Sequence, residues 1–118
     1  MQAAIEQFFS AWAMTDDGER HSAIDSALAD GATYSDPRSG GRFDNVDVIA
    51  EYVGHFSANA PGWAATVQAV DEVNGYAKVI VNFGGPGPDG EEMSQLGTYF
   101  AEANQDGKLI ALAGFAGA

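Results

Sequence analysis

The dipeptide Asn74-Gly75 separates two stretches, 63–73 and 76–83, that are rich in β-forming residues. Both central positions of a type I′ turn require a positive φ, which Asn and Gly adopt more readily than other residues. The pattern therefore predicts a tight hairpin of two antiparallel strands.

The rest of the second half reads as a continuation of this meander. A Gly- and Pro-rich loop is expected over 84–90, followed by a long strand over 93–103. A turn over 104–107 then leads into a last strand over 108–115.

The first half has helical periodicity instead. Ile5, Phe8, Phe9 and Trp12 recur at the spacing of one helix face, which places three aromatic rings on one stripe. A second helix is expected to start after the turn at 16–19, where the acidic residues resemble a capping box.

This second helix is expected to end near Asp30-Gly31, and a short strand over 32–36 follows, stopped by Pro37. Asp44 is the expected cap of a third helix. The apolar stripe of that helix is formed by Val46, Ile49, Val53 and Phe56.

Three helices with one short strand among them, followed by a meander of strands, are typical of an α+β domain with its helices on one face of the sheet. The 118 residues are the right number for one domain spanning 1–118.

Many strand positions carry Ala or Gly, which permits a sharply curved sheet or leaves space over its inner face. We expect a cavity over this inner face, lined by aromatic side chains, although these aromatic side chains could instead simply fill the core. The aromatic residues expected to line the cavity are Phe8, Trp12, Tyr34, Tyr52, Phe56, Trp63 and Phe115.

Composition excludes several kinds of partner and chemistry. The net charge of −12 disfavours nucleic acid and anionic membranes as partners. The chain has no Cys and only two His, which excludes thiolate chemistry and argues against a metal site. No apolar run approaches the roughly 20 residues that span a bilayer, and the N-terminus lacks the features of a signal peptide. We therefore expect a cytoplasmic protein that uses no cofactor. The expected apolar cavity further predicts a small apolar molecule as its partner.

The segment 32–37 (ATYSDP), followed by 38–40 (RSG) and by a helix containing 48–52 (VIAEY), resembles the nuclear transport factor 2-like superfamily. More narrowly, it is similar to the ketosteroid isomerases and the SnoaL-like polyketide cyclases. The likeness extends through 106–110 (DGKLI), and the order of elements agrees over nearly the whole chain. The resemblance implies a conical α+β barrel of the cystatin-like type, a hydrophobic pocket and a homodimer.

In the ketosteroid isomerases, the aspartate of the matching Asp-Pro motif is the general base that moves a proton beside a carbonyl group. The resemblance gives this role to Asp36. The isomerases also use two oxyanion donors, a tyrosine on the first helix and a protonated aspartic acid on a strand. This chain has Phe8 and Tyr99 at the corresponding places, so one donor is absent and the other differs in kind.

Asp36 has two interpretations from the residues around it. It shares a strand face with Tyr34, and if that face points inward, desolvation disfavours the charged carboxylate, which suits a general base. Alternatively, Asp36 forms an ordinary Asx-turn over Pro37-Arg38.

Tyr99 is the expected hydrogen-bond donor to an oxyanion, because its neighbours on the strand face, Gly97 and Ala101, leave space for a ligand. The alternative is a tyrosine at the sheet surface or a dimer interface. His55 is expected to be exposed or at an interface, and His21 to be partly buried with its polar groups paired.

The leading hypothesis is a pocket enzyme, an isomerase, cyclase or dehydratase that acts on an apolar carbonyl compound with Asp36 as acid and base. The alternatives are a non-catalytic module that binds a hydrophobic ligand, and a purely structural dimer with a filled pocket. A homodimer is expected to form over the strand face that carries Leu96, Thr98 and Phe100.

Overall fold

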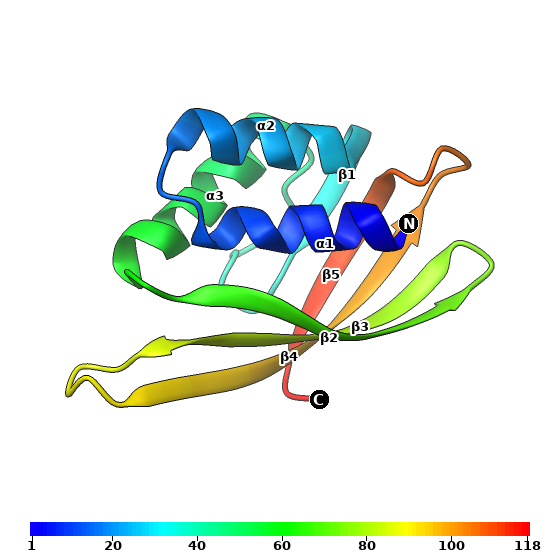
Figure 1. The fold of residues 1–118 in the computed structure, drawn as a ribbon. Coiled ribbons are helices and arrows are strands. Elements are labelled where there is room, and N and C mark those ends of the chain that lie inside the picture. The colour runs from blue at the N-terminus through cyan, green and yellow to red at the C-terminus, as the bar shows by residue number, and fades with distance from the viewer.

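The computed structural model describes all 118 residues and shows a helical layer packed on one face of a five-stranded sheet (Figure 1). The helices are α1 (Gln2–Ser10), its short 3-10 continuation η1 (Ala11–Ala13), α2 (Asp17–Ala27) and α3 (Val46–Asn59). The strands are β1 (Leu28–Ser35), β2 (Ala64–Val73), β3 (Tyr76–Pro86), β4 (Glu92–Ala103) and β5 (Leu109–Ala116). The expected α+β class is confirmed.

The sheet has the order β1-β5-β4-β3-β2, so it curves without closing and β1 and β2 are its edges. All pairs are antiparallel except β1 with β5, which is parallel. The predicted hairpin is confirmed, since Asn74 and Gly75 have φ values of 51° and 87° between the paired residues Val73 and Tyr76. The conical barrel expected from the sequence is therefore an open one.

Several element boundaries differ from the expected ones. The second helix ends at Ala27, and β1 begins at once with Leu28, so Gly31 with its φ of 74° lies within the strand. A register shift between Leu28 and Thr33 accommodates this irregular stretch. The strand β3 also continues through Gly84 and Gly85, which were expected in the loop, because both pair with β4.

The cap of α3 is Asn45 and not the expected Asp44. The Asn45 side chain accepts hydrogen bonds from the backbone N–H groups of Asp47 and Val48 at 2.8 and 3.3 Å. Asn and Asp are about equally good caps, so the local sequence could not distinguish between these adjacent positions.

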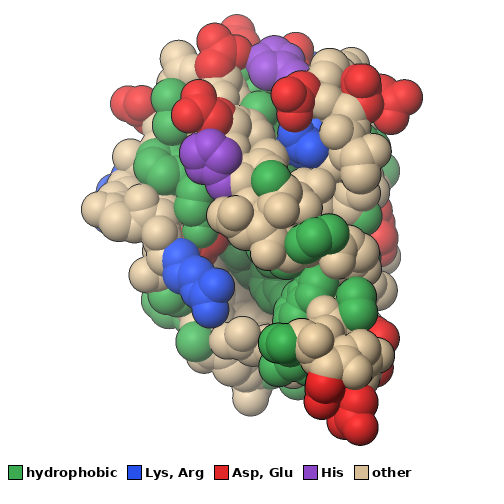
Figure 2. All heavy atoms as spheres, turned by 90° about the vertical axis from the view of Figure 1, so that its left-hand side faces the viewer, with side chains coloured by type: hydrophobic (Ala, Val, Ile, Leu, Met, Phe, Trp, Pro, Cys, Tyr) green, Lys and Arg blue, Asp and Glu red, His purple; other side chains and the backbone are tan.

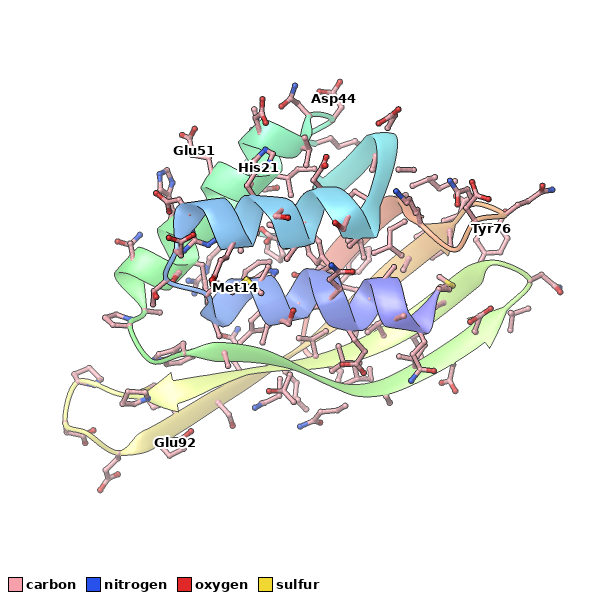
Figure 3. The ribbon with its side chains drawn as sticks, turned by 45° about the horizontal axis from the view of Figure 1, so that its top comes forward. Met14, His21, Asp44, Glu51, Tyr76 and Glu92 are labelled. Carbon is pink, nitrogen blue, oxygen red and sulfur yellow. The ribbon has the colours of Figure 1, made fainter.

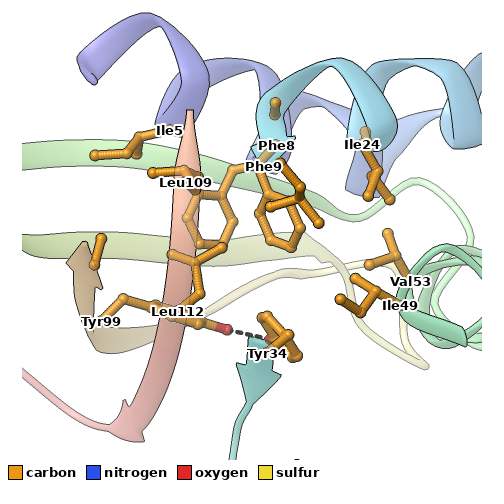
Figure 4. Packing of buried hydrophobic residues seen from close by; sticks show 14 of the residues in the cluster. Ile5, Phe8, Phe9, Ile24, Tyr34, Ile49, Val53, Tyr99, Leu109 and Leu112 are labelled. Carbon is orange, nitrogen blue, oxygen red and sulfur yellow. Dashed lines mark hydrogen bonds between the residues drawn. The ribbon is translucent and has the colours of Figure 1, made fainter. Parts of the chain in front are cut away.

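The core lies between α1 and the concave face of the sheet. The expected stripe on α1 is confirmed, with Ile5, Phe8 and Phe9 fully buried. Figure 4 shows these side chains directed at β5 and at Tyr99, and the Phe9 ring meets the Tyr99 ring edge-on at 4.9 Å. Each buried side chain of this size contributes roughly 1.5–3 kcal/mol by leaving water, so the stripe holds α1 across the sheet.

The buried Arg20 ties the other two helices together. Its guanidinium donates to the Met14 carbonyl oxygen at 2.5 Å and to Asp17 at 2.6 Å. The Ser57 hydroxyl on α3 donates to the same Met14 oxygen at 2.9 Å. Figure 3 shows Met14 at the end of the helical layer where these segments meet. Gly54 makes room for the guanidinium, since a Cβ there would lie 2.9 Å from an Arg20 nitrogen.

The outer face of the sheet carries exposed aromatic side chains. Phe100 and Tyr76 are 42% and 49% exposed, and their rings lie 5.8 Å apart. The expected homodimer over this face stays a prediction. None of the helices has the length and apolar character needed to cross a membrane.

Candidate functional site

A cavity of about 450 Å³ opens between the end of the helical layer and the sheet. Figure 2 shows this hollow with hydrophobic side chains inside it and a Lys or Arg side chain at its edge. The volume falls within the range of pockets that hold small molecules. The lining residues are Trp12, Asp36, Pro37, Arg38, Tyr52, His55, Phe56, Asn59, Ala60, Trp63, Phe83, Gln95, Leu96, Gly97, Tyr99, Gly114, Phe115 and Ala116.

One wall of the cavity is a stripe on α3. Tyr52, His55, Phe56 and Asn59 follow the spacing i, i+3, i+4 and i+7, which brings them to one helix face. Trp12 from η1 meets the Phe56 ring edge-on at 5.0 Å. The inner part of this wall is therefore aromatic.

The opposite wall depends on small residues in β4 and β5. Tyr99 pairs with Gly114, and a Cβ at Gly114 would lie only 2.6 Å from the Tyr99 ring. The glycine therefore lets the Tyr99 ring lie over β5.

Asp36 follows the last residue of β1 and is half buried on the cavity wall. Its Oδ2 accepts a hydrogen bond from the Tyr34 hydroxyl at 2.6 Å, and its Oδ1 accepts one from the Arg38 backbone N–H at 2.8 Å. The Tyr52 hydroxyl lies within hydrogen-bonding distance of both oxygens, at 2.7 and 2.8 Å. Both interpretations from the sequence thus hold together, since Asp36 forms the Asx-turn and also faces the cavity.

Only three protons are available for these four contacts, because the Tyr52 hydroxyl has one proton to share between Oδ1 and Oδ2. A carboxylate has about four acceptor positions. One position on Asp36 therefore remains free, and it can take a proton from a bound molecule.

The hydrogen bonds continue from Asp36 to the sheet. The Tyr34 and Tyr99 hydroxyls lie 2.7 Å apart, as the dashed line in Figure 4 marks. A carboxylate can only accept, so the Tyr34 proton goes to Asp36 and the Tyr99 proton goes to Tyr34. The order of donation is thus Tyr99 to Tyr34 to Asp36.

All three tyrosines in this network are held in their protonated form. Burial is the main cause that raises the pKa of Tyr34, Tyr52 and Tyr99 above the usual tyrosine value. The negative charge of Asp36 raises the pKa of each further. The three hydroxyls therefore remain hydrogen-bond donors across the neutral pH range.

The structure brings seven of the nine expected site residues to the cavity and leaves two away from it. Phe8 and Tyr34 are fully buried and are not part of the lining. Phe8 packs against the Phe9 and Tyr34 rings in the core, and Tyr34 reaches the site only through its hydroxyl. Phe115 is 61% exposed and lies at the mouth. The expected residues that line the cavity are Trp12, Asp36, Tyr52, Phe56, Trp63, Tyr99 and Phe115.

Sequence reasoning missed the polar side of the site. Tyr52 was expected only as an aromatic residue of the wall, yet its hydroxyl donates a hydrogen bond to Asp36. Asn59, which was not expected, lies about two helical turns beyond Tyr52 on the same face of α3. The i, i+7 spacing between Tyr52 and Asn59 on α3 was the sequence signal that could have predicted Asn59 on the cavity wall.

His55 is exposed, as expected, and lies at the cavity edge. His21 is half buried and pairs with Asp47 of α3 at 2.7 Å. No group of three or more His, Cys, Asp or Glu side chains is arranged to hold a metal ion.

This open, curved sheet under three helices, with a cavity at one end, defines the nuclear transport factor 2-like class of folds. Residues 5–112 match the SnoaL-like domain, and the chain belongs to that family. No sequence among the curated proteins matches this chain.

Solved structures agree in fold over nearly the whole chain. A proposed isomerase of the SnoaL-like family from Agrobacterium tumefaciens strain C58 is 19% identical with a TM-score of 0.82, covering 99% of this chain and 97% of that one. A proposed SnoaL-like polyketide cyclase from Jannaschia sp. CCS1 is 13% identical with a TM-score of 0.76, covering 97% and 83%. TerC, co-crystallised with polyporic acid, is 16% identical with a TM-score of 0.72, covering 97% and 91%.

Proposed function

We propose that this protein is a small-molecule pocket enzyme that moves a proton beside a carbonyl group of a mostly apolar substrate, as cofactor-independent isomerases, cyclases and dehydratases do. The observation that carries the proposal is the Asp36 carboxylate, which faces an aromatic cavity with one acceptor position free. Membership of the SnoaL-like family supports a reaction or binding role of this kind.

The first step uses the free position on Asp36. The carboxylate takes the proton from the carbon next to the carbonyl group, and the electron pair of the broken C–H bond moves into the enolate, whose oxygen becomes negative. Return of the same proton to a different carbon completes an isomerisation. A group that both removes and returns the proton needs no cofactor.

The tyrosine network can follow this movement of charge. Once Asp36 is protonated, Tyr34 no longer has a carboxylate to donate to, and its hydroxyl can turn to donate to Tyr99. Tyr99 is then free to donate its own proton to the enolate oxygen. Asp36 Oδ2 and the Tyr99 oxygen lie no more than 5.3 Å apart, since hydrogen bonds of 2.6 and 2.7 Å join both to the Tyr34 oxygen. One carbonyl group with its adjacent carbon can therefore reach both residues.

The proposal is tested with 2-tetralone, an apolar bicyclic ketone whose acidic protons exchange with deuterated water. We expect the protein to accelerate this exchange, measured by NMR, and Asp36→Asn to reduce the acceleration by about 100-fold or more, the effect typical of a lost general base. The control is Asp44→Asn, because Asp44 is exposed and lies outside the cavity. Rapid exchange in folded Asp36→Asn protein would show that Asp36 is not the base.

The Asp36→Asn variant requires a check of folding. In the variant, the amide nitrogen of the new Asn would face a tyrosine hydroxyl that donates to a carboxylate oxygen in the wild-type protein. The loss of a buried hydrogen bond typically costs about 1–3 kcal/mol. The exchange rate is therefore compared at a temperature where circular dichroism shows both variants to be folded.

A non-catalytic role in binding a hydrophobic ligand is the second candidate. It is favoured by the three donors that already occupy Asp36. In that case the cavity would bind 2-tetralone, as seen by quenching of tryptophan fluorescence, and the rate of exchange would equal that in buffer.

A further inference from the structure

Positive charge is scarce on this protein, and one unpaired positive group lies on the cavity. The chain has 5 Lys and Arg against 17 Asp and Glu. Arg20 is paired with Asp17, and Lys78 lies 3.7 Å from Asp71. Arg38 is exposed, lines the cavity and forms no ion pair with any acidic residue.

The backbone that carries Arg38 is held firmly. Its N–H donates to Asp36 Oδ1 at 2.8 Å, and the Ser39 backbone N–H donates to the Asp36 carbonyl oxygen at 3.2 Å. The Asp36 N–H in turn donates to the Ser39 hydroxyl at 3.1 Å. The turn thus fixes where the arginine leaves the chain, and only the side chain itself is free to move toward a ligand.

The cavity separates its polar groups from its apolar ones. His55, Asn59 and Gln95 are exposed lining residues, so hydrogen-bond donors surround the opening together with Arg38. Trp12 and Phe56 belong to the deeper, less exposed part of the lining. The positive charge of Arg38 acts on the site itself, since it opposes the rise in the pKa of Tyr52.

We infer that the cavity takes an amphipathic acid, with an apolar carbonyl-containing body inside and a carboxylate at the mouth bound by Arg38. An arginine guanidinium matches a carboxylate with two parallel hydrogen bonds. A protein with a net charge of −12 repels anions elsewhere on its surface, so Arg38 selects for an acid at this position. The inference rests on the proposed function in one respect, that the cavity binds a small molecule.

Two fluorescent probes of nearly the same shape separate the apolar contribution from the charged one. N-phenyl-1-naphthylamine is neutral, and 8-anilinonaphthalene-1-sulfonate carries an additional anionic group that stands for the carboxylate. Both tryptophans of the chain, Trp12 and Trp63, line the cavity. Energy transfer from tryptophan to the probe therefore reports that the probe binds, and the Arg38 and Arg42 variants locate the anionic probe.

We expect the wild-type protein to bind the anionic probe more tightly than the neutral one. Arg38→Gln should lower the affinity for the anionic probe by about tenfold and leave the affinity for the neutral probe unchanged. The matched control is Arg42→Gln, from the same loop but outside the cavity lining, which should change neither. Salt above about 0.5 M should weaken only the anionic probe, because it screens an exposed charge pair.

The outcomes separate the two proposals. If the neutral probe binds and Arg38→Gln leaves the ratio of the two affinities unchanged, the inference about the acid group is wrong and the pocket proposal stands. If neither probe binds in the cavity, both are wrong. An equal loss of affinity for the anionic probe in the Arg38→Gln and Arg42→Gln variants would assign the effect to general surface charge. This result would also overturn the inference.

Discussion

The hydroxyl oxygens of Tyr34 and Tyr99 lie 2.7 Å apart in the core, although the two residues are 65 positions apart in the sequence. Tyr34 is on β1 and Tyr99 on β4, and β5 lies between these strands in the sheet. The hydrogen bond therefore spans a strand on the concave face. It connects the position of Asp36, through Tyr34, to the middle of the sheet.

Removal of the Tyr34 hydroxyl should destabilise the protein. Tyr34→Phe leaves the Tyr99 hydroxyl without its acceptor and removes one donor from Asp36. We expect the free energy of unfolding, measured with urea, to fall by about 1–3 kcal/mol. The control is Tyr76→Phe, because Tyr76 is 49% exposed and far from the site (Figure 3), and its effect should stay within about 0.5 kcal/mol. Equal effects would mean that the network adds nothing to stability.

Stability should fall at alkaline pH because of the buried tyrosines. The pKa of Tyr34 and of Tyr99 is raised in the folded protein, mainly by burial, whereas in the unfolded chain both titrate near about pH 10. The folded state thus holds its protons longer than the unfolded state. Their contribution is fully present below about pH 10 and is lost as the pH rises above it, at about 1.4 kcal/mol per pH unit for each tyrosine.

This pH dependence is measured by urea unfolding between about pH 8 and pH 11.5. Tyr99→Phe should make the alkaline decline shallower by about 1.4 kcal/mol per pH unit, because one of the tyrosines with a raised pKa is gone. An unchanged slope in this variant would assign the alkaline loss to other groups.

Gly114 should tolerate no side chain. In Gly114→Ala the new Cβ would lie 2.6 Å from the Tyr99 ring, so the ring or the strand must shift. Overpacking of this kind costs about 1–3 kcal/mol, and thermal unfolding should show the loss. Gly41→Ala is the matched control, since no atom lies within 4 Å of a Cβ there and its φ is ordinary. If Gly114→Ala leaves the thermal stability unchanged, the Tyr99 ring has room to shift without a loss of stability.

The sequence identified the elements well where a strong local pattern was present. The stripe on α1 and the Asn74-Gly75 hairpin both appear as expected, because periodicity and turn geometry act over a few residues. Boundaries were less certain, as the choice of Asn45 over Asp44 as the cap of α3 illustrates. Tertiary packing decides between neighbouring residues with equal local preference.

The candidate site was predictable in part. Asp36 and most of the aromatic wall were expected, and they line the cavity. The tyrosine hydroxyls that donate to Asp36 were not expected, because Tyr52 comes from a helix 16 positions later and Tyr34 was expected only as an aromatic lining residue. Phe8 was placed on the cavity wall because helical periodicity gives the buried face of a helix and not which part of that face meets a void.

By itself, the sequence determined the class of the fold, the hairpin and the presence of a carboxylate at the end of β1. Only the tertiary structure decided which hydroxyls surround that carboxylate, and that an unpaired arginine lies at the mouth of the same cavity. The physical reason is that local patterns fix backbone geometry over a few residues. Hydrogen bonds between distant segments depend on strand order, sheet curvature and the small side chains that let elements approach.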